Sequence, residues 1–233
     1  MGFSAEWLAL REPADVRARD PGLMGMAAVF AAARGGVVMD LGCGTGALAR
    51  AMGPRLPGAR WRMVDGDAGL LARAAQTPGA RAIEADLGDL DALPFGGVGL
   101  VACTALLDLM PADWAMRLAR HVSDVQAGFY AALSYTGVMA FDPPHPGDAA
   151  VTAAFNRHQA GDKGLGPAMG PESVRATAAA FSAAGFAVEA APSPWRIGPD
   201  EAPLREALLD GIAQAASEAG CAEAAVWRQM PRE

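Results

Sequence analysis

The amino-acid sequence predicts a doubly wound α/β fold, with a mostly parallel seven-stranded sheet and helices on both faces. Segments typical of buried strands alternate four times with segments typical of helices between residues 37 and 135. A glycine-rich turn joins the first of these strands to its helix. Ligands of such sheets bind beyond the carboxyl ends of the strands. The predicted strands end at Asp40, Asp65, Asp86 and Thr104.

The composition indicates one globular domain over residues 1–233. The chain has 233 residues, 52% of them hydrophobic, which is enough to bury a large core. Its formal net charge of −7 disfavours nucleic acid as a partner, because no basic surplus neutralises phosphates. The widely spaced Cys43, Cys103 and Cys221 predict no metal site and no disulfide framework, which favours a reducing, cytoplasmic location. We expect no signal peptide and no membrane span.

Residues 1–34 are predicted to form a helical cap ahead of the sheet, with two helices over residues 4–33. Arg11, Asp15 and Arg19 recur every four residues, so they share one helix face if the helix continues through Pro13. The alternative is that Pro13 begins a second helix. The charged row is interpreted either as a solvated face or as part of a lid.

The segment VVMDLGCGTGALA, residues 37–49, has the pattern of a buried strand, a tight turn and a helix start. Gly42, Gly44 and Gly46 remove side chains where the backbone turns sharply and where a ligand can lie against it. The glycine spacing formally fits a dinucleotide-binding turn. Asp40 argues against a dinucleotide, because its carboxylate would repel a pyrophosphate and attract a cationic ligand.

This turn resembles motif I of the class I S-adenosylmethionine-dependent methyltransferases, in which an apolar run, an acid and three alternating glycines follow one another. The resemblance implies S-adenosylmethionine as the cofactor, with Asp40 and the three glycines in its site. It also implies that N-terminal helices cover the cofactor. Trp7, Arg11 and Arg19 are the candidates there, since an arginine of such a helix can meet the methionine carboxylate.

The second predicted strand, residues 59–65, ends in an acidic residue beside the same site. Asp65 lies about twenty residues beyond the glycine turn, the spacing at which an acid meets ribose hydroxyls in such folds. Asp65 and the adjoining Gly66 are therefore predicted to bind the cofactor. Asp67 is instead expected to cap the next helix.

Two further strands are predicted to supply the rest of the cofactor site. The third, residues 80–87, ends in Asp86 and Leu87, which resemble the family's adenine-binding pair. The fourth, residues 97–104, ends at Thr104 and runs into a segment that resembles motif IV, where many family members carry the residues that line the methyl group.

The remaining chain is predicted to complete the sheet and to build the acceptor side of the site. A fifth strand covers residues 129–135, although the residues before it lack the Pro-Gly-Gly hairpin usual in the family. The turn-rich segment 136–170 is interpreted as an insertion on the ligand side of the sheet rather than a separate domain. Helices are expected over 171–184 and 203–219, and the last two strands over 186–190 and 195–197.

Methyl transfer from a sulfonium is an in-line displacement, so positioning supplies much of the rate, and a base is needed only if the acceptor loses a proton. His145 and Asp142 are the leading candidates for catalysis, because the insertion lies where an acceptor should enter. The other candidates are Tyr130, Tyr135, Asp108 and His158. Each of the six has a structural alternative, as a core, helix-capping or surface residue.

The sequence thus predicts an enzyme that transfers a methyl group from S-adenosylmethionine to an O, N or C atom of a small molecule, with S-adenosylhomocysteine as the product. Two alternatives stay open. One is an NAD(P)-dependent oxidoreductase on a Rossmann fold, and the other is a non-catalytic S-adenosylmethionine-binding module. No nucleic-acid or membrane partner is expected, and the sequence does not indicate an oligomeric state.

Overall fold

A computed structural model describes residues 3–230, so the first two residues of the predicted N-terminal cap lie outside the described residues. Five parallel strands form one sheet in the order β3-β2-β1-β4-β5. The order reverses beside β1, so the carboxyl ends of β1 and β4 flank a crevice of the kind in which α/β proteins bind ligands. The strands are β1 (Val37–Leu41), β2 (Arg60–Asp65), β3 (Ala80–Glu84), β4 (Leu100–Thr104) and β5 (Gly128–Ala132).

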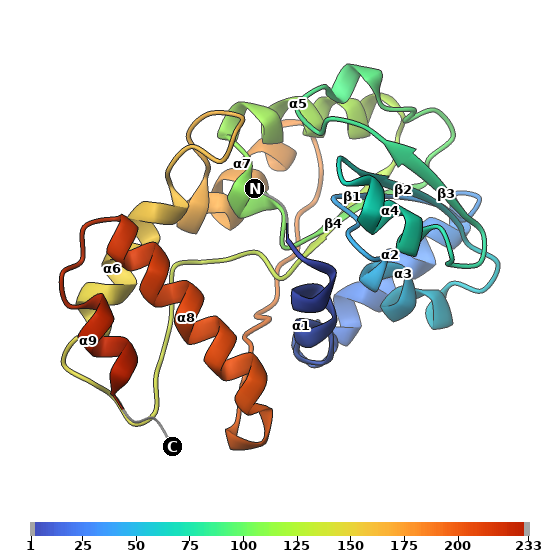
Figure 1. Cartoon of the computed structure of the whole chain (residues 1–233). Coiled ribbons are helices and arrows are strands. Elements are labelled where there is room, and N and C mark those ends of the chain that lie inside the picture. The colour runs from blue at the N-terminus through green and yellow to red at the C-terminus, as the bar shows by residue number, and fades with distance from the viewer. Residues whose placement is uncertain (1–2, 231–233) are drawn as a thin grey trace.

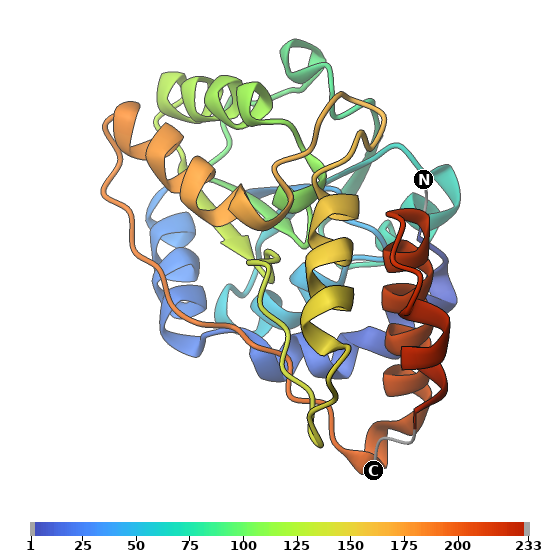
Figure 2. The ribbon, with the colours of Figure 1, turned by 90° about the vertical axis from the view of Figure 1, so that its left-hand side faces the viewer.

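The prediction of seven strands is wrong by two, both after α7 (Ser173–Ala183). Residues 186–198 have no regular secondary structure and form no ladder with β5. Pro192 and Pro194, which separate the two predicted strands, have no N–H group to donate to a neighbouring strand. The segment instead runs alongside the sheet domain as an irregular chain, orange in Figure 2.

Helices cover both faces of the sheet, as predicted (Figures 1 and 2). On one face, α2 (Pro21–Ala33), α3 (Ala47–Met52) and α4 (Ala68–Ala74) pack against Val38, Met63 and Ala102. On the other face, α5 (Ala112–Asp124) and α7 pack against Met39 and Val101. Successive strand residues point to opposite faces, so both faces of each central strand are apolar.

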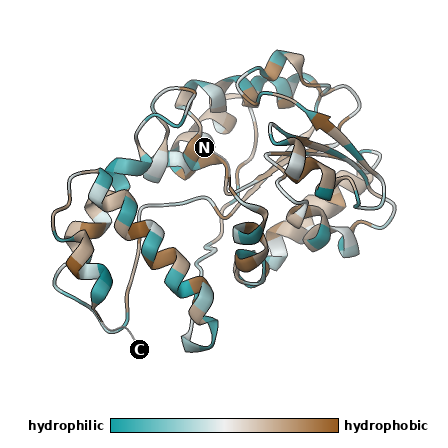
Figure 3. Ribbon diagram, in the orientation of Figure 1, coloured by the Kyte–Doolittle hydropathy of each residue, from teal (hydrophilic) through white to brown (hydrophobic). Residues whose placement is uncertain are grey.

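A third group of helices packs away from the sheet. In it, α6 (Asp148–Gln159), α8 (Ala202–Glu218) and α9 (Ala224–Gln229) share a core that includes Val151, Leu209 and Trp227. Figure 3 shows hydrophobic and hydrophilic stripes along α8, which fits a helix with one packed and one exposed face. We call this group the helical lobe; α6 belongs to the predicted insertion, whereas α8 and α9 come from the C-terminal part of the chain.

The N-terminal helix α1 (Ala5–Ala18) continues through Pro13. Ser4 caps it, with its side chain accepting a hydrogen bond from the Trp7 N–H. A short connection leads to α2, where Asp20 is the N-cap and Pro21 occupies the first turn. Because the helix is not broken at Pro13, Arg11 and Asp15 lie one turn apart on the same face.

Candidate functional site

The glycine turn closes tightly against the end of β2. Gly42, Gly44 and Gly46 all have positive φ angles, at 65°, 53° and 85°, which a side chain would strain. The Gly44 N–H donates to Oδ2 of Asp65 at 2.8 Å, and the Asp67 N–H donates to Oδ1 at 3.0 Å. Asp65 is thereby fixed at the crevice, with lone pairs left on both oxygens for further donors such as ribose hydroxyls.

Asp40 is a buried carboxylate with neither oxygen hydrogen-bonded within the described chain. Its side chain is 1% exposed, and both Oδ1 and Oδ2 lack a partner. Burial raises the pKa of Asp40 to about 7, against the opposing effect of Arg19, while the Asp65 charge raises it further. A buried, unpaired carboxylate is costly, and a bound cation or ammonium group would relieve that cost.

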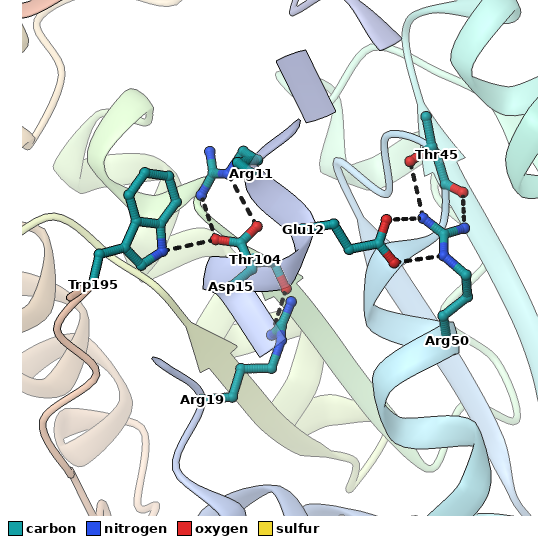
Figure 4. Close-up of polar contacts among 8 residues, drawn as sticks. All are labelled: Arg11, Glu12, Asp15, Arg19, Thr45, Arg50, Thr104 and Trp195. Atoms are coloured by element: carbon teal, nitrogen blue, oxygen red, sulfur yellow. Dashed lines mark hydrogen bonds and ion pairs between the residues drawn. The ribbon is translucent and has the colours of Figure 1, made fainter. Parts of the chain in front are cut away.

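Arg19, at the carboxyl end of α1, is buried on the other side of the crevice. Its Nη1 donates to Oγ1 of Thr104 at the end of β4, at 3.2 Å, whereas Nε and Nη2 have no partner among the described residues (Figure 4). No ion pair joins Arg19 to Asp40 within residues 3–230, although Arg19 lowers the pKa of that acid. Two opposite charges are therefore buried near one another without being paired.

Helix α1 lies over the glycine turn and is tied down at both sides. A Cβ on Gly44 would stand 3.0 Å from Leu8, so the helix packs directly on the turn. Glu12 accepts two hydrogen bonds of 2.7 Å from Arg50 of α3, whose guanidinium also reaches Oγ1 of Thr45 at 3.1 Å (Figure 4). The predicted cap therefore covers the predicted cofactor site.

The second attachment of α1 joins Arg11 and Asp15, from the predicted charged row, to Trp195, for which the sequence predicted no functional role. Arg11 forms a bidentate pair with Asp15, at 3.0 and 3.1 Å, and lies 4.7 Å from the centre of the Trp195 ring. Trp195 donates its indole N–H to Asp15 at 3.0 Å (Figure 4). Trp195 belongs to the segment predicted as a last strand, and no sequence signal pairs it with α1. Trp7, also predicted to contact the cofactor, is half-buried on the same helix.

Asp86 and Leu87 follow β3, at the outer end of the crevice. Asp86 is exposed and accepts a hydrogen bond from the Gly88 N–H at 2.8 Å. The Leu87 carbonyl accepts from the Trp114 indole at 2.6 Å, which anchors this segment on α5. Leu165, from the loop after α6, stands over Gly88, where an added Cβ would approach it to 2.8 Å. Gly66 follows Asp65 directly and lies next to the Ala85 carbonyl.

Asp108 and Tyr135 come together beyond the ends of β4 and β5. Asp108, in the short helix η3 (Leu107–Leu109), is 8% exposed, and its Oδ1 has no partner among the described residues. The Tyr135 backbone N–H donates to its carboxylate. The Tyr135 hydroxyl donates to Oδ1 of Asn156 on α6 at 2.6 Å. Burial and the Asp108 charge raise the pKa of Tyr135 to about 12, which makes this phenol a poor base at neutral pH.

The backbone around this second cluster adopts unusual conformations. Ala105 and Leu133, one residue beyond β4 and β5, have φ angles of 50° and 60°. Residues with side chains rarely adopt the left-handed region, and where they do the strain is often part of a functional site. These two turns redirect the chain, so that Asp108 and Tyr135 lie at the crevice.

The other predicted catalytic residues are not brought to the crevice. His145 lies in the turn before α6, where its Nδ1 accepts from the Gly147 N–H at 3.0 Å, beside Trp227 of α9. Asp142 is exposed in the loop that leads outward from the strand ends to α6 (Figure 1). His158 pairs with Glu218 of α8 at 3.0 Å. Their proposed roles in catalysis stay predictions, and the structure assigns each a place in or beside the helical lobe.

Tyr130 is 7% exposed on β5 and belongs to the core on the α2 face. Burial raises the pKa of its hydroxyl, while the nearby Arg19 opposes that rise. Tyr130 is therefore a packed core residue whose hydroxyl is close enough to Arg19 to feel its charge.

A surface cavity of about 670 Å³ lies elsewhere, at the start of β2 and before β3, lined by Arg60, Trp61 and Gly79 among others. The residues of the candidate site lie at the opposite, carboxyl ends of these strands. Within residues 3–230, no three His, Cys, Asp or Glu side chains cluster in a way that could hold a metal ion. Helices that are long and apolar enough to cross a bilayer are not found in the same part of the chain.

Residues 38–127, less than half of the chain, match a family model described as a methyltransferase domain. This segment contains the glycine turn and every predicted cofactor residue from Asp40 to Thr104. No curated protein matches the sequence.

Among solved structures, the chain is similar to an O-methyltransferase family protein from Burkholderia thailandensis, with 19% identity and a TM-score of 0.49 over 77% of this chain and 52% of that one. Human N-acetylserotonin methyltransferase, solved with S-adenosylmethionine, has 19% identity and a TM-score of 0.45, over 76% of this chain and 46% of that one. A putative O-methyltransferase from Nostoc punctiforme has 18% identity and a TM-score of 0.46, over 71% and 51%. The chain thus spans about half the length of these proteins.

Proposed function

We propose that this chain transfers the methyl group of S-adenosylmethionine to an O, N or C atom of a small molecule, because residues 38–127 match a family model described as a methyltransferase domain. The rest of the chain would then cover the cofactor, through α1, and build the acceptor side, through the helical lobe and the loop after α6.

The observation that carries this proposal is the pair of unpaired buried charges at Asp40 and Arg19. The methionine end of S-adenosylmethionine is a zwitterion, with an ammonium group and a carboxylate on one carbon. An ammonium facing Asp40 and a carboxylate facing Arg19 would satisfy both buried groups at once. The free oxygen lone pairs of Asp65 suit the ribose hydroxyls, and Asp86 suits the adenine amine.

The alternatives account for these groups less well. A dinucleotide would bring a pyrophosphate close to Asp40, and that contact would repel a carboxylate already destabilised by burial. A non-catalytic binding module would need no second cluster of buried polar groups beside the cofactor, yet Asp108 and Tyr135 form one.

In the proposed reaction S-adenosylmethionine supplies an electrophilic methyl group on a sulfonium. The chain's contribution is positional. Asp40 and Arg19 hold the amino-acid end, Asp65 holds the ribose, and α1 excludes water by packing on the glycine turn. The acceptor atom must lie behind the methyl group in line with sulfur, and such positioning supplies much of the rate.

The test is calorimetric titration of the purified protein with S-adenosylmethionine, S-adenosylhomocysteine and NAD. We expect micromolar binding of the first two and none of NAD. Arg19→Gln should weaken S-adenosylmethionine at least tenfold, whereas Arg175→Gln, which alters an exposed surface pair, should not. NAD binding tighter than S-adenosylmethionine would refute the proposal. Screening small acceptors with detection of S-adenosylhomocysteine then tests turnover.

A further inference from the structure

A second buried carboxylate, Asp108, stands beside the proposed cofactor site with one oxygen free. Its Oδ1 has no hydrogen-bond partner in residues 3–230, although the side chain is 92% buried. A buried acceptor without a donor costs free energy, so such a group calls for an explanation by function. Asp108 follows Thr104 by four residues and therefore lies near the end of β4. At that strand end Arg19 donates a hydrogen bond to Thr104.

Polar and charged groups from several elements act on Asp108 or its neighbour Tyr135. The Tyr135 N–H donates to it from the turn after β5, and the Tyr135 hydroxyl is held by Asn156. Arg11 of α1 and Lys163 of the loop after α6 both lower the pKa of Asp108, while burial, the largest cause, raises it. The remaining titratable neighbour is the buried thiol of Cys103 on β4.

The two cations differ in how far they are neutralised. Arg11 is already paired with Asp15, whereas Lys163 forms no ion pair with a carboxylate among the described residues. Its Nζ lies 3.3 Å from Nδ1 of His158, and the charge of Glu218, which pairs with His158, raises the pKa of Lys163 more than the charge of Asp108 does. Lys163 is the only lysine in the sequence. Its loop also carries Leu165, which stands over Gly88 at the proposed adenine end. One loop thus carries both a side chain over the proposed adenine end and a cation whose charge acts on Asp108.

We propose that Asp108 is the base of the acceptor site and that the acceptor is a small hydroxyl compound, methylated on oxygen, with Lys163 stabilising the charge that develops on that oxygen. This inference rests on the proposed methyltransferase function. The cations beside Asp108 disfavour an acceptor that arrives as a protonated amine, because like charges repel. They favour a neutral hydroxyl that becomes more negative in the transition state.

In the proposed step the acceptor oxygen forms a bond to the methyl carbon while the carbon–sulfur bond breaks. The electron pair of the carbon–sulfur bond stays on sulfur, which leaves as S-adenosylhomocysteine. The hydroxyl proton passes to Oδ1 of Asp108 and then to solvent. Asp108 must be ionised to take this proton, so turnover should rise with pH through its pKa, which burial raises from its ordinary value.

The first test needs no acceptor. Acetic anhydride labelling, read by peptide mass spectrometry across pH, reports the pKa of Lys163 directly. Burial lowers the pKa of Lys163, and the charges of Glu218 and then Asp108 oppose that effect, so Asp108→Asn should move the labelling midpoint to lower pH. The matched control Asp124→Asn removes an exposed acid at the far end of α5 and should leave the midpoint unchanged. An unchanged midpoint in Asp108→Asn would refute the arrangement.

The second test uses matched alcohol and amine pairs, beginning with catechol and 1,2-phenylenediamine and extending to larger aromatic and aliphatic pairs. We expect methylation of hydroxyl members on oxygen. Asp108→Asn should lower kcat about 100-fold to 10,000-fold and remove the acid limb of the pH profile. Lys163→Gln should lower kcat and move that limb to higher pH, since Lys163 lowers the pKa of Asp108.

Calorimetry with S-adenosylmethionine distinguishes failure of the proposed function from failure of the inference on Asp108. If S-adenosylmethionine does not bind the wild-type protein, the proposed function fails. If it binds Asp108→Asn as it binds wild type, that variant is folded and its kinetics are informative. Methylation of nitrogen, no turnover of any hydroxyl compound, or an Asp108→Asn variant with wild-type kcat and acid limb would each overturn the inference on Asp108 alone.

Discussion

At the scale of single residues, the crevice contains buried charged groups that other residues between 3 and 230 do not pair. Asp40 and Arg19 lie on opposite sides of the order reversal in the sheet, and each keeps polar atoms without partners. Proteins rarely retain such groups, because they cost stability. Their presence at the carboxyl ends of β1 and β4 is best explained by a ligand that carries both charges.

Asp40→Asn should make the unliganded protein more stable while weakening its binding of S-adenosylmethionine. The pKa of Asp40 is about 7 when folded, against an ordinary value of 3.8, so the folded state retains a proton that the unfolded state releases. Wild-type stability therefore falls as pH rises from about 4 to above 7. At pH 8 the variant should gain about 2–4 kcal/mol in the free energy of unfolding, and at pH 4 little. Urea unfolding at both pH values checks this, and equal pH dependence of the two proteins would contradict it.

Asp65 should contribute both to the binding of the cofactor and to the stability of the glycine turn. Asp65→Ala is expected to weaken S-adenosylmethionine binding by roughly 2–4 kcal/mol, because two charge-assisted hydrogen bonds to ribose are lost. The variant should also lose about 1–2 kcal/mol of stability, since the N–H groups of Gly44 and Asp67 lose their acceptor. Calorimetry and urea unfolding measure the two effects, with the exposed Asp124→Ala as control. An unchanged dissociation constant would show that Asp65 does not touch the cofactor.

At the scale of elements, α1 is a cover held by a few specific contacts rather than by a large core. Only Ala14 and Asp15 are buried within it, and its attachments include the Glu12–Arg50 pair, the cluster of Arg11, Asp15 and Trp195, and the exposed Arg17–Glu201 pair. Elements with few buried apolar contacts open at low free energy. A cofactor that binds beneath α1 can therefore enter by local opening of this helix.

Trp195→Phe should loosen α1 without unfolding the sheet. The substitution removes the indole hydrogen bond to a buried carboxylate, worth about 1.5–3 kcal/mol, and keeps an aromatic ring beside Arg11. Amide hydrogen exchange should quicken in α1 and stay unchanged in β1 and β4. Arg17→Gln serves as the control, because it breaks an exposed ion pair between α1 and Glu201 in the C-terminal part of the chain. The loss of this pair should lower the free energy of unfolding by less than about 1 kcal/mol. Equal exchange in both variants would argue against an anchoring role for Trp195.

At the scale of the whole molecule, the sheet domain and the helical lobe contribute to different parts of the proposed site. The proposed cofactor residues lie on strand ends and α1, whereas Asn156 and the loop with Lys163 belong to the lobe side. The core of the lobe is separate from the two cores that flank the sheet. The acceptor site is therefore expected to depend on the lobe more than the cofactor site does.

Leu209→Ala should affect acceptor turnover while sparing S-adenosylmethionine binding. Leu209 is 6% exposed in the core of the lobe, and truncation of such a leucine costs roughly 2–4 kcal/mol. Exchange should quicken in α6, α8 and α9, and the cofactor dissociation constant should change less than twofold. Leu209→Met keeps the side-chain volume and serves as the control. A cofactor affinity that falls together with the lobe's stability would show that the two parts are not separable.

The sequence by itself determined the parallel α/β sheet, its first five strands and the residues at their ends. These features depend on local patterns: apolar runs of strand length, positive φ at Gly42 and Gly44, and acids directly after strands. The Arg11–Asp15 pair was also predictable, because helical periodicity fixes a four-residue spacing.

Only the tertiary structure decided how distant segments meet. It placed His145 beside Trp227, left residues 186–198 outside the sheet, and brought Trp195 onto α1. It also left Asp40, Arg19 and Asp108 buried with unpaired atoms. Burial and pairing depend on contacts between residues far apart in sequence, and these contacts leave no periodic trace in the chain. For that reason the strand-end residues of the proposed cofactor site could be located from the sequence, whereas the surroundings of the proposed acceptor site could not.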